Sequence, residues 1–302
     1  MKYFFQIVLI LVVATSVAQQ DAQYTQYMYN TINFNPAYAG SRGALSIFGL
    51  HRSQWVGLDG APTTNTFSIH SPIRNSNLGF GLSFINDKIG PTSENQISAD
   101  ISYSLNISNE WLMSFGIKGT ANLFNLDVSK LNPETPLDPS LQDLNNYFTP
   151  NLGAGIYVHS DKAYFGFSIP NFFETTRYAD QTQSVSKQRM NYYIMGGYVF
   201  DINPNLKFKP AFLSKIAEGA PLQFDLSGNF LFYEKFVLGG AWRWNAAWSA
   251  MAGYQITDGL FIGYAFDQET TNLARFNSGS HEVFLRFELF QKAERIISPR
   301  FF

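Results

Sequence analysis

The sequence predicts an all-β protein: a transmembrane antiparallel β-barrel of about 14 strands, preceded by a cleaved signal peptide. Three observations predict it. Apolar and small polar residues alternate along many runs, short and long connections alternate between the runs, and the chain is poor in charge. Charged residues make up 15% of the 302 residues and aromatic residues 17%, whereas a typical soluble domain is about 25% charged. The net charge of -2 gives no reason to expect a nucleic-acid partner.

The first 18 residues have the pattern of a secretory signal peptide. Lys2 supplies the positive charge, Tyr3 to Ala14 form an apolar stretch, and Ser16 and Ala18 place small residues before a cut at Gln19. A membrane-anchor helix is the alternative, but the stretch is shorter than the roughly 20 residues that a spanning helix needs. No later apolar run is long enough to span a bilayer as a helix, so we expect the mature protein to enter a membrane as a barrel.

Alternation with a period of two residues dominates the rest of the chain. Within 97–108, the apolar set Ile97, Ala99, Ile101, Tyr103, Leu105 and Ile107 alternates with Ser98, Asp100, Ser102, Ser104, Asn106 and Ser108. Runs near 78–84, 222–232, 248–256 and 283–289 behave in the same way. A soluble β-sandwich also alternates, but its wet face usually carries Lys and Glu, whereas this polar face is mostly Ser, Gly, Asn, Gln and Thr. Small polar residues suit a barrel lumen, and Leu, Phe and Ile suit lipid.

About 14 strand-like runs can be counted, an even number as a closed antiparallel barrel requires. They lie near 43–52, 62–71, 77–87, 95–107, 111–126, 147–158, 162–170, 189–201, 205–215, 221–232, 235–245, 248–257, 259–268 and 280–290. Every second connection is a short turn, and the others are longer, including 87–95; the tight turn at 245–247 breaks the rule. Short turns on one side and long loops on the other are typical of outer-membrane barrels, which have short periplasmic turns and longer extracellular loops.

These boundaries predict four regions. Residues 1–18 are the signal peptide, 19–42 a periplasmic or luminal segment, 43–290 the barrel, and 291–302 a periplasmic tail. Both termini of the mature protein are expected on the periplasmic side of the outer membrane of a Gram-negative cell. The segment before the first strand is long enough to fold into a barrel of this size, whose pore is either narrow or filled.

Tryptophans lie at the ends of predicted strands. Trp242, Trp244 and Trp248 flank the tight turn at 245–247, and Trp111 opens a strand beside a short turn. We expect these four rings at the membrane interfaces, although packing within a hairpin is an equal alternative for each one.

The sequence contains no catalytic constellation. There is no cysteine, and the four histidines are scattered, so no metal site or cofactor is predicted. Ser68 and His70 share one strand face, which makes a lipid hydrolase the weakest hypothesis; lumen-lining polar residues are the simpler interpretation. Gly79 and Gly81 alternate within a strand with no helix after them, so they do not form a phosphate loop.

Residues 20–73 and the last six residues resemble the PorP/SprF family of Bacteroidota outer-membrane proteins. The matching pieces are QYMYN (Gln26 to Asn30), NPAYAG (Asn35 to Gly40), HRSQW (His51 to Trp55), GAPTT (Gly60 to Thr64) and ISPRFF (Ile297 to Phe302). The middle of the chain matches in strand rhythm only.

The resemblance implies a non-enzymatic component of the type IX secretion system. Some members support export or surface display of large gliding adhesins, and others join periplasmic lipoproteins and a peptidoglycan-binding linker. The resemblance brings no catalytic residue. The alternative function is a general outer-membrane channel for small solutes.

The motif residues are candidates for a plug or seam, or for docking a partner: Asn35, Pro36, Ala37, Tyr38, Gly40, Arg52, Gln54 and Trp55. Pro36 restricts Asn35 to extended or turn geometry. Gly40 frees the chain just before it enters the barrel wall.

Overall fold

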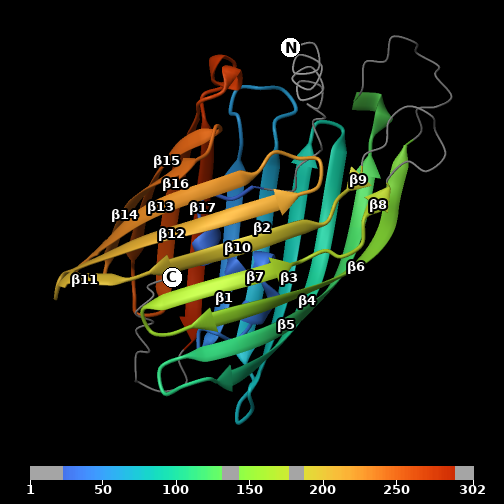
Figure 1. Cartoon of the computed structure of the whole chain (residues 1–302). Helices are drawn as coiled ribbons and strands as arrows, with labels where there is room; N and C mark the ends of the chain where they lie inside the picture. Colours follow the sequence, from blue (N-terminus) through green and yellow to red (C-terminus); the bar gives the residue numbers. More distant parts are fainter. Residues whose placement is uncertain (1–22, 131–142, 177–186, 290–302) are drawn as a thin grey trace, which may run out of the picture.

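Alternating side chains along each strand produce a sheet that closes on itself (Figure 1). The computed structural model describes residues 23–130, 143–176 and 187–289. The predicted signal peptide (1–18), residues 19–22 of the predicted segment after it, and the predicted tail (291–302) therefore lie outside the described residues. Within the described ranges, no helix has the length and apolar character to cross a membrane.

Fourteen antiparallel strands form the wall, with β10 and β11 counted as one strand. They are β1 (Leu45–Ser53), β2 (Thr63–Pro72), β3 (Leu78–Ile89), β4 (Thr92–Asn106), β5 (Leu112–Leu126), β6 (Leu144–His159), β7 (Ala163–Ile169), β10 (Asn191–Tyr198) continued by β11 (Phe200–Asn203), β12 (Leu206–Ala217), β13 (Gln223–Phe232), β14 (Phe236–Arg243), β15 (Ala247–Gln255), β16 (Leu260–Glu269) and β17 (Ser280–Leu289). A small separate hairpin consists of β8 (Thr175–Thr176) and β9 (Lys187–Gln188). Two 3-10 turns lie in loops, η3 (Val128–Lys130) and η4 (Asn272–Arg275).

The first and last strands close the barrel. β1 pairs with β17 from Leu45 opposite Leu289 to Ser53 opposite His281. On the far side, β10 pairs with both β7 and β12. Because every wall strand has two neighbours, the wall leaves few unpaired backbone groups in the membrane.

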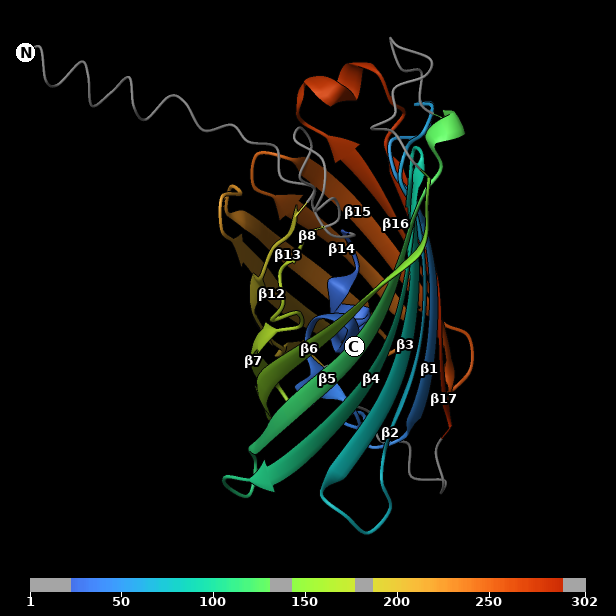
Figure 2. The same cartoon turned by 90° about the vertical axis from the view of Figure 1, so that its right-hand side faces the viewer.

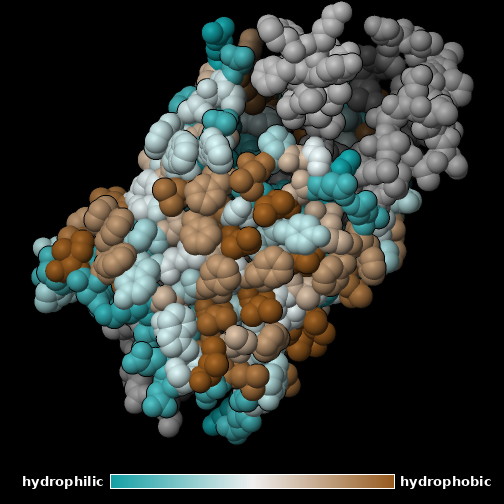
Figure 3. All heavy atoms as spheres, viewed as in Figure 1, coloured by the Kyte–Doolittle hydropathy of each residue, from teal (hydrophilic) through white to brown (hydrophobic). Residues whose placement is uncertain are grey.

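Side chains on the two faces of the wall have opposite character, as predicted for a membrane barrel. On β3 the apolar Leu78, Phe80, Leu82 and Phe84 are exposed outward, and Ser83 is buried toward the lumen. Figure 3 shows apolar side chains gathered over the wall, with hydrophilic side chains at the lower turns. A soluble sandwich would bury the apolar face instead, so the barrel prediction is confirmed.

The two ends of the barrel differ in their connections. One end has only short turns: 73–77, 107–111, 160–162, 204–205, 233–235 and 256–259. The other end carries the long connections 54–62, 127–143, 170–190 and 270–279. We call these the short-turn end and the long-loop end.

One predicted long loop, 87–95, is wrong. β3 and β4 continue to a tight turn at Gly90 and Pro91, where Gly90 has a φ of 53°. The side chain of Asn86 on β3 donates a hydrogen bond to that of Asn95 on β4 at 2.8 Å. Polar residues therefore continue the β3–β4 pairing here, and no apolar alternation in the sequence predicts it. β4, β5 and β6, at 15 to 16 residues, exceed the ~10 residues that cross a bilayer.

Residues 23–44, which we call the luminal segment, lie inside the wall (Figure 2). The segment contains three short helical turns: η1 (Tyr27–Tyr29), α2 (Thr31–Phe34) and η2 (Pro36–Tyr38). Most of its side chains are buried, although it consists of only a few turns of helix. It leaves Gln23 at the long-loop end and Ala44 at the short-turn end, so Gln23 and Leu289 lie at opposite ends of the barrel.

Candidate functional site: the filled lumen

The centre of the luminal segment is fixed by Asn35. Its Oδ1 accepts from the backbone N–H of Ala37 at 3.0 Å, which caps η2, and Pro36 occupies the first position of that turn. Its Nδ2 donates to the carbonyl of Ile156 on β6 at 2.9 Å. Asn35 and Ala37 have no exposed surface. One amide side chain therefore both shapes the turn and ties it to the wall.

Glycines in the wall make room for this turn. A Cβ on Gly79 would overlap the carbonyl oxygen of Ala39, one on Gly116 the nitrogen of Ala37, and one on Gly155 the Oδ1 of Asn35. These three glycines lie on β3, β5 and β6 and face the lumen. Any larger residue would collide with the backbone or the amide of the segment. The turn therefore requires glycine at these three wall positions.

Tyr38 and Gly40 contact the part of the lumen nearer the short-turn end. The ring of Tyr38 packs edge-on against His70 and Tyr157. The N–H of Gly40 donates to Nδ1 of His70 at 3.2 Å. Gly40 has a φ of 76°, and a Cβ there would lie 3.0 Å from the Cα atoms of Pro72 and Gly79. Both the backbone geometry and the space require glycine.

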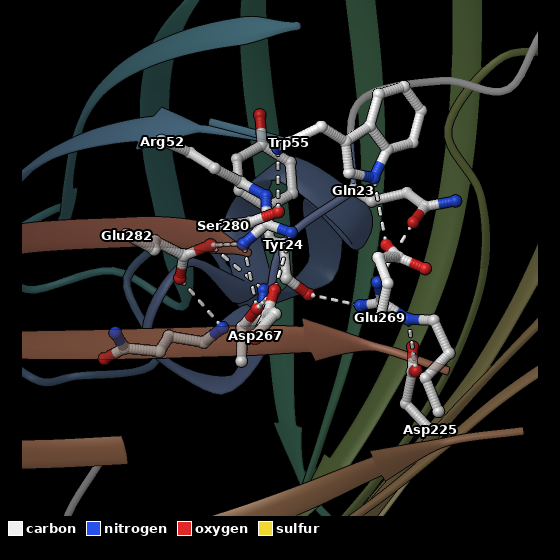
Figure 4. Close-up of polar contacts among 12 residues, drawn as sticks. Gln23, Tyr24, Arg52, Trp55, Asp225, Asp267, Glu269, Ser280 and Glu282 are labelled. Atoms are coloured by element: carbon white, nitrogen blue, oxygen red, sulfur yellow. Dashed lines mark hydrogen bonds and ion pairs between the residues drawn. The ribbon is translucent and has the colours of Figure 1, made fainter. Parts of the chain in front are cut away.

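Arg52 binds the part of the segment nearer the long-loop end (Figure 4). Its guanidinium is 2% exposed and lies 2.6 Å from Asp267 and 3.2 Å from Glu282. It also donates to Oγ1 of Thr25 at 2.9 Å. Glu282 in turn accepts from the backbone N–H groups of Thr25 and Gln26 at 3.0 and 2.9 Å. Every charge of this buried cluster has a partner, as burial requires.

A second arginine contacts the first described residues. Arg243 donates to the Gln23 side chain at 3.0 Å and to the Tyr24 carbonyl at 3.2 Å, and pairs with Asp225 at 2.6 Å. The predicted Trp55 lies nearby, where its indole N–H donates to Glu269 at 3.0 Å. Figure 4 shows Trp55, Glu269 and Asp225 around Tyr24 and Gln23.

The remaining predicted motif residue, Gln54, lies just beyond β1. Its side chain is nearly buried, and its backbone N–H donates to the carbonyl of Pro62 at 2.9 Å, which closes the first long loop. Gln54 and Trp55 thus flank the mouth of the lumen, whereas Asn35 to Gly40 lie deep inside it.

Two further ion pairs join the segment to the wall. Arg42 and Glu288 form a two-pronged pair at 2.6 and 3.0 Å. Lys118 pairs with Asp100 at 3.1 Å and donates to the carbonyl of Ile32 at 3.2 Å. These contacts join the segment to β17, β4 and β5.

Ser68 and His70 face the lumen but do not form a catalytic pair. The Ser68 hydroxyl donates weakly to Asn30 at 3.4 Å, and His70 accepts from Gly40. Both side chains are buried against the segment. Within the described residues, no group of three or more acidic or histidine side chains could hold a metal ion.

The four tryptophans predicted for the interfaces lie at both ends of the wall. Trp111 adjoins a short turn. Trp242 and Trp248 face each other across β14 and β15 with ring centroids 6.0 Å apart, and Trp244 and Trp248 are about half exposed, at 48% and 59%. Their position at the lipid headgroups stays a prediction.

The acidic partners of the arginines were missed from the sequence: Asp225, Asp267, Glu282 and Glu288. Each carboxylate lies at a lumen-facing position of its strand, and on β17 Glu282 and Glu288 share that face with Arg286. A charge at a lumen-facing position was the available signal. It does not reveal which arginine each carboxylate meets.

A family model described as "Type IX secretion system membrane protein PorP/SprF" matches residues 16–287. No curated protein matches the chain. Among solved structures, the chain is similar to a KdgM porin, at 9% identity and a TM-score of 0.38 over 81% of this chain and 99% of that one. It is similar to a Pseudomonas aeruginosa FadL homologue, at 12% identity and a TM-score of 0.43 over 86% and 94%. It is also similar to a TodX deltaS2S3 mutant monoaromatic hydrocarbon channel, at 9% identity and a TM-score of 0.49 over 88% and 94%. Such distant likeness carries no argument about function.

Proposed function

The chain belongs to the type IX secretion system membrane protein PorP/SprF family, and from this premise we propose that it is a non-enzymatic outer-membrane component that supports export or surface anchoring of secreted proteins such as gliding adhesins. It would hold a client at the cell surface and contact other secretion components in the periplasm. Those partners would include periplasmic lipoproteins and a peptidoglycan-binding linker.

The observation that carries this proposal is the filled lumen. The luminal segment contacts the wall through buried hydrogen bonds and through the Arg52, Arg243 and Lys118 clusters. Removing one partner from such a cluster leaves a buried charge unpaired, which is strongly unfavourable. A barrel filled in this way favours a holding role over an open conduit.

The polar lumen residues also favour a role without catalysis. Ser68 and His70 are occupied by Asn30 and Gly40 of the segment rather than by each other. A serine nucleophile needs a base within hydrogen-bond reach and an accessible reacting site.

In this proposal the long-loop end faces the outside and the short-turn end faces the periplasm, the usual arrangement of outer-membrane barrels. Among the described residues, Phe276 in the loop before β17 is 66% exposed at the long-loop end, and Tyr233 in the turn before β14 is 69% exposed at the short-turn end. They form a matched pair of probes for the two faces.

The test is affinity purification of a tagged chain from its own membranes. We expect recovery of one large secreted protein together with periplasmic secretion components. Phe276→Glu should reduce recovery of the secreted protein and spare the periplasmic components, and Tyr233→Glu should do the reverse. Recovery of no partner, with uptake of small solutes by vesicles containing the purified barrel, would instead support the channel function.

A further inference from the structure

The luminal segment runs the full height of the wall. Near the short-turn end, the N–H of Gly40 donates a hydrogen bond to His70 on β2, and Arg42 forms an ion pair with Glu288 on β17. Ala44 then leads directly into β1. This is the short-turn end.

At its upper end the segment reaches the opposite mouth. Thr25 meets Asp267 and Glu282, near the top of β16 and β17, and Gln23 meets Arg243, the last residue of β14. All three wall residues adjoin the long-loop end, because their strands enter or leave there. In Figure 4, Gln23 lies beside Trp55 and Glu269 at this mouth.

We infer that the segment is threaded through the barrel and delivers its amino-terminal end to the long-loop end, so that this end and the carboxyl end of β17 lie on opposite sides of the membrane. This differs from the expectation from the sequence that both termini lie on the periplasmic side. With the orientation given under Proposed function, on which this inference rests, the mouth of the lumen around Gln23 faces the cell exterior.

Chain length excludes a return to the other side. With the predicted cut before Gln19, only four residues would precede the first described residue, and four residues span at most about 14 Å when fully extended. Arg52, at the level of Thr25, is separated from Leu45 by about 23 Å along β1, or about 18 Å of height for a strand tilted by roughly 40°. The lumen between these levels is already occupied by the segment itself.

The absence of cysteine from the chain provides a direct test. We would place single cysteines by Ala22→Cys before the segment, Asp59→Cys in an exposed long loop, and Glu110→Cys in an exposed short turn. Intact cells would be treated with a membrane-impermeant maleimide. We expect Ala22→Cys to label as strongly as Asp59→Cys, and Glu110→Cys to label only after the outer membrane is permeabilised.

Each other outcome has a distinct meaning. If Ala22→Cys labels only after permeabilisation while Asp59→Cys labels in intact cells, threading is overturned. If Asp59→Cys and Ala22→Cys are both protected while Glu110→Cys labels, the segment is threaded but the proposed orientation fails. Gln20→Cys repeats the measurement should Ala22→Cys not assemble, and a heat-dependent gel shift reports assembly of every variant.

Discussion

Gly116 on β5 faces the backbone nitrogen of Ala37 so closely that a Cβ on Gly116 would overlap it. Neither partner can move easily, because Ala37 is bonded to Asn35 and Gly116 is hydrogen-bonded within the wall. An added methyl group therefore has no room between the luminal segment and β5 at this position. It provides a one-atom test of whether the segment seals the lumen.

Gly116→Ala should displace the segment. Overpacking of this kind costs about 1–3 kcal/mol, and we expect a lower midpoint of chemical unfolding in lipid vesicles and a higher conductance in planar bilayers. The matched control is Gly119→Ala on the same strand, where a Cβ meets nothing within 4 Å. Equal conductance of the two variants and the parent would contradict sealing by the segment.

Arg52→Ala should be severely destabilising. It leaves Asp267 and Glu282 buried without their common cation, and breaking a buried pair in this way costs about 3–5 kcal/mol. Lys162→Ala, which breaks the exposed pair with Asp201 at 2.7 Å, should cost less than about 1 kcal/mol. The unfolding midpoints of both variants, followed by tryptophan fluorescence, check the contrast. A small loss for Arg52→Ala would show that water replaces the cation.

Asn35→Ala should loosen the turn that contains Pro36. It removes the cap on Ala37 and leaves the carbonyl of Ile156 unpaired, at an expected cost of about 2–4 kcal/mol. Asn33 is the control: two positions away, its side-chain amide has no hydrogen-bond partner among the described residues, so Asn33→Ala should change stability little. Comparable losses in the two variants would exclude the specific role of Asn35.

A disulfide should form between the segment and β3. A Cβ on Gly81 would lie 3.6 Å from that of Ala39, within the range that disulfides adopt. Its nearest obstacle is the flexible end of the Ile32 side chain at 2.5 Å. We expect Ala39→Cys/Gly81→Cys to oxidise spontaneously, detected as a mobility change on reduction. Ala39→Cys/Gly49→Cys should not, since Gly49 faces outward. A reduced first pair would place the segment elsewhere.

The wall could be predicted from the sequence because its pattern is local. Alternation within 97–108 is enough to identify β4 and to assign its lumen face. The same signal fails at Asn86 and Asn95, where polar residues on both faces leave no alternation, and the ladder is seen only in three dimensions.

The contents of the lumen could be predicted only in part. Asn35 and Pro36 predict a turn, and Gly40 predicts freedom of the backbone, because these are properties of single residues. The partners of Arg52 are 215 and 230 positions away. Such pairing depends on closure of the whole barrel, which no local pattern encodes.

Pairing of β1 with β17 also constrains the order of assembly. β17 is the last wall strand to be synthesised, and its Glu282 accepts hydrogen bonds from Thr25 and Gln26, close to the start of the mature chain. A barrel that closed before the segment was inside would bury this carboxylate without those donors. Closure of the β1–β17 seam therefore reaches its lowest free energy only with the luminal segment in place, because a barrel closed without it would keep an unsatisfied carboxylate in its lumen.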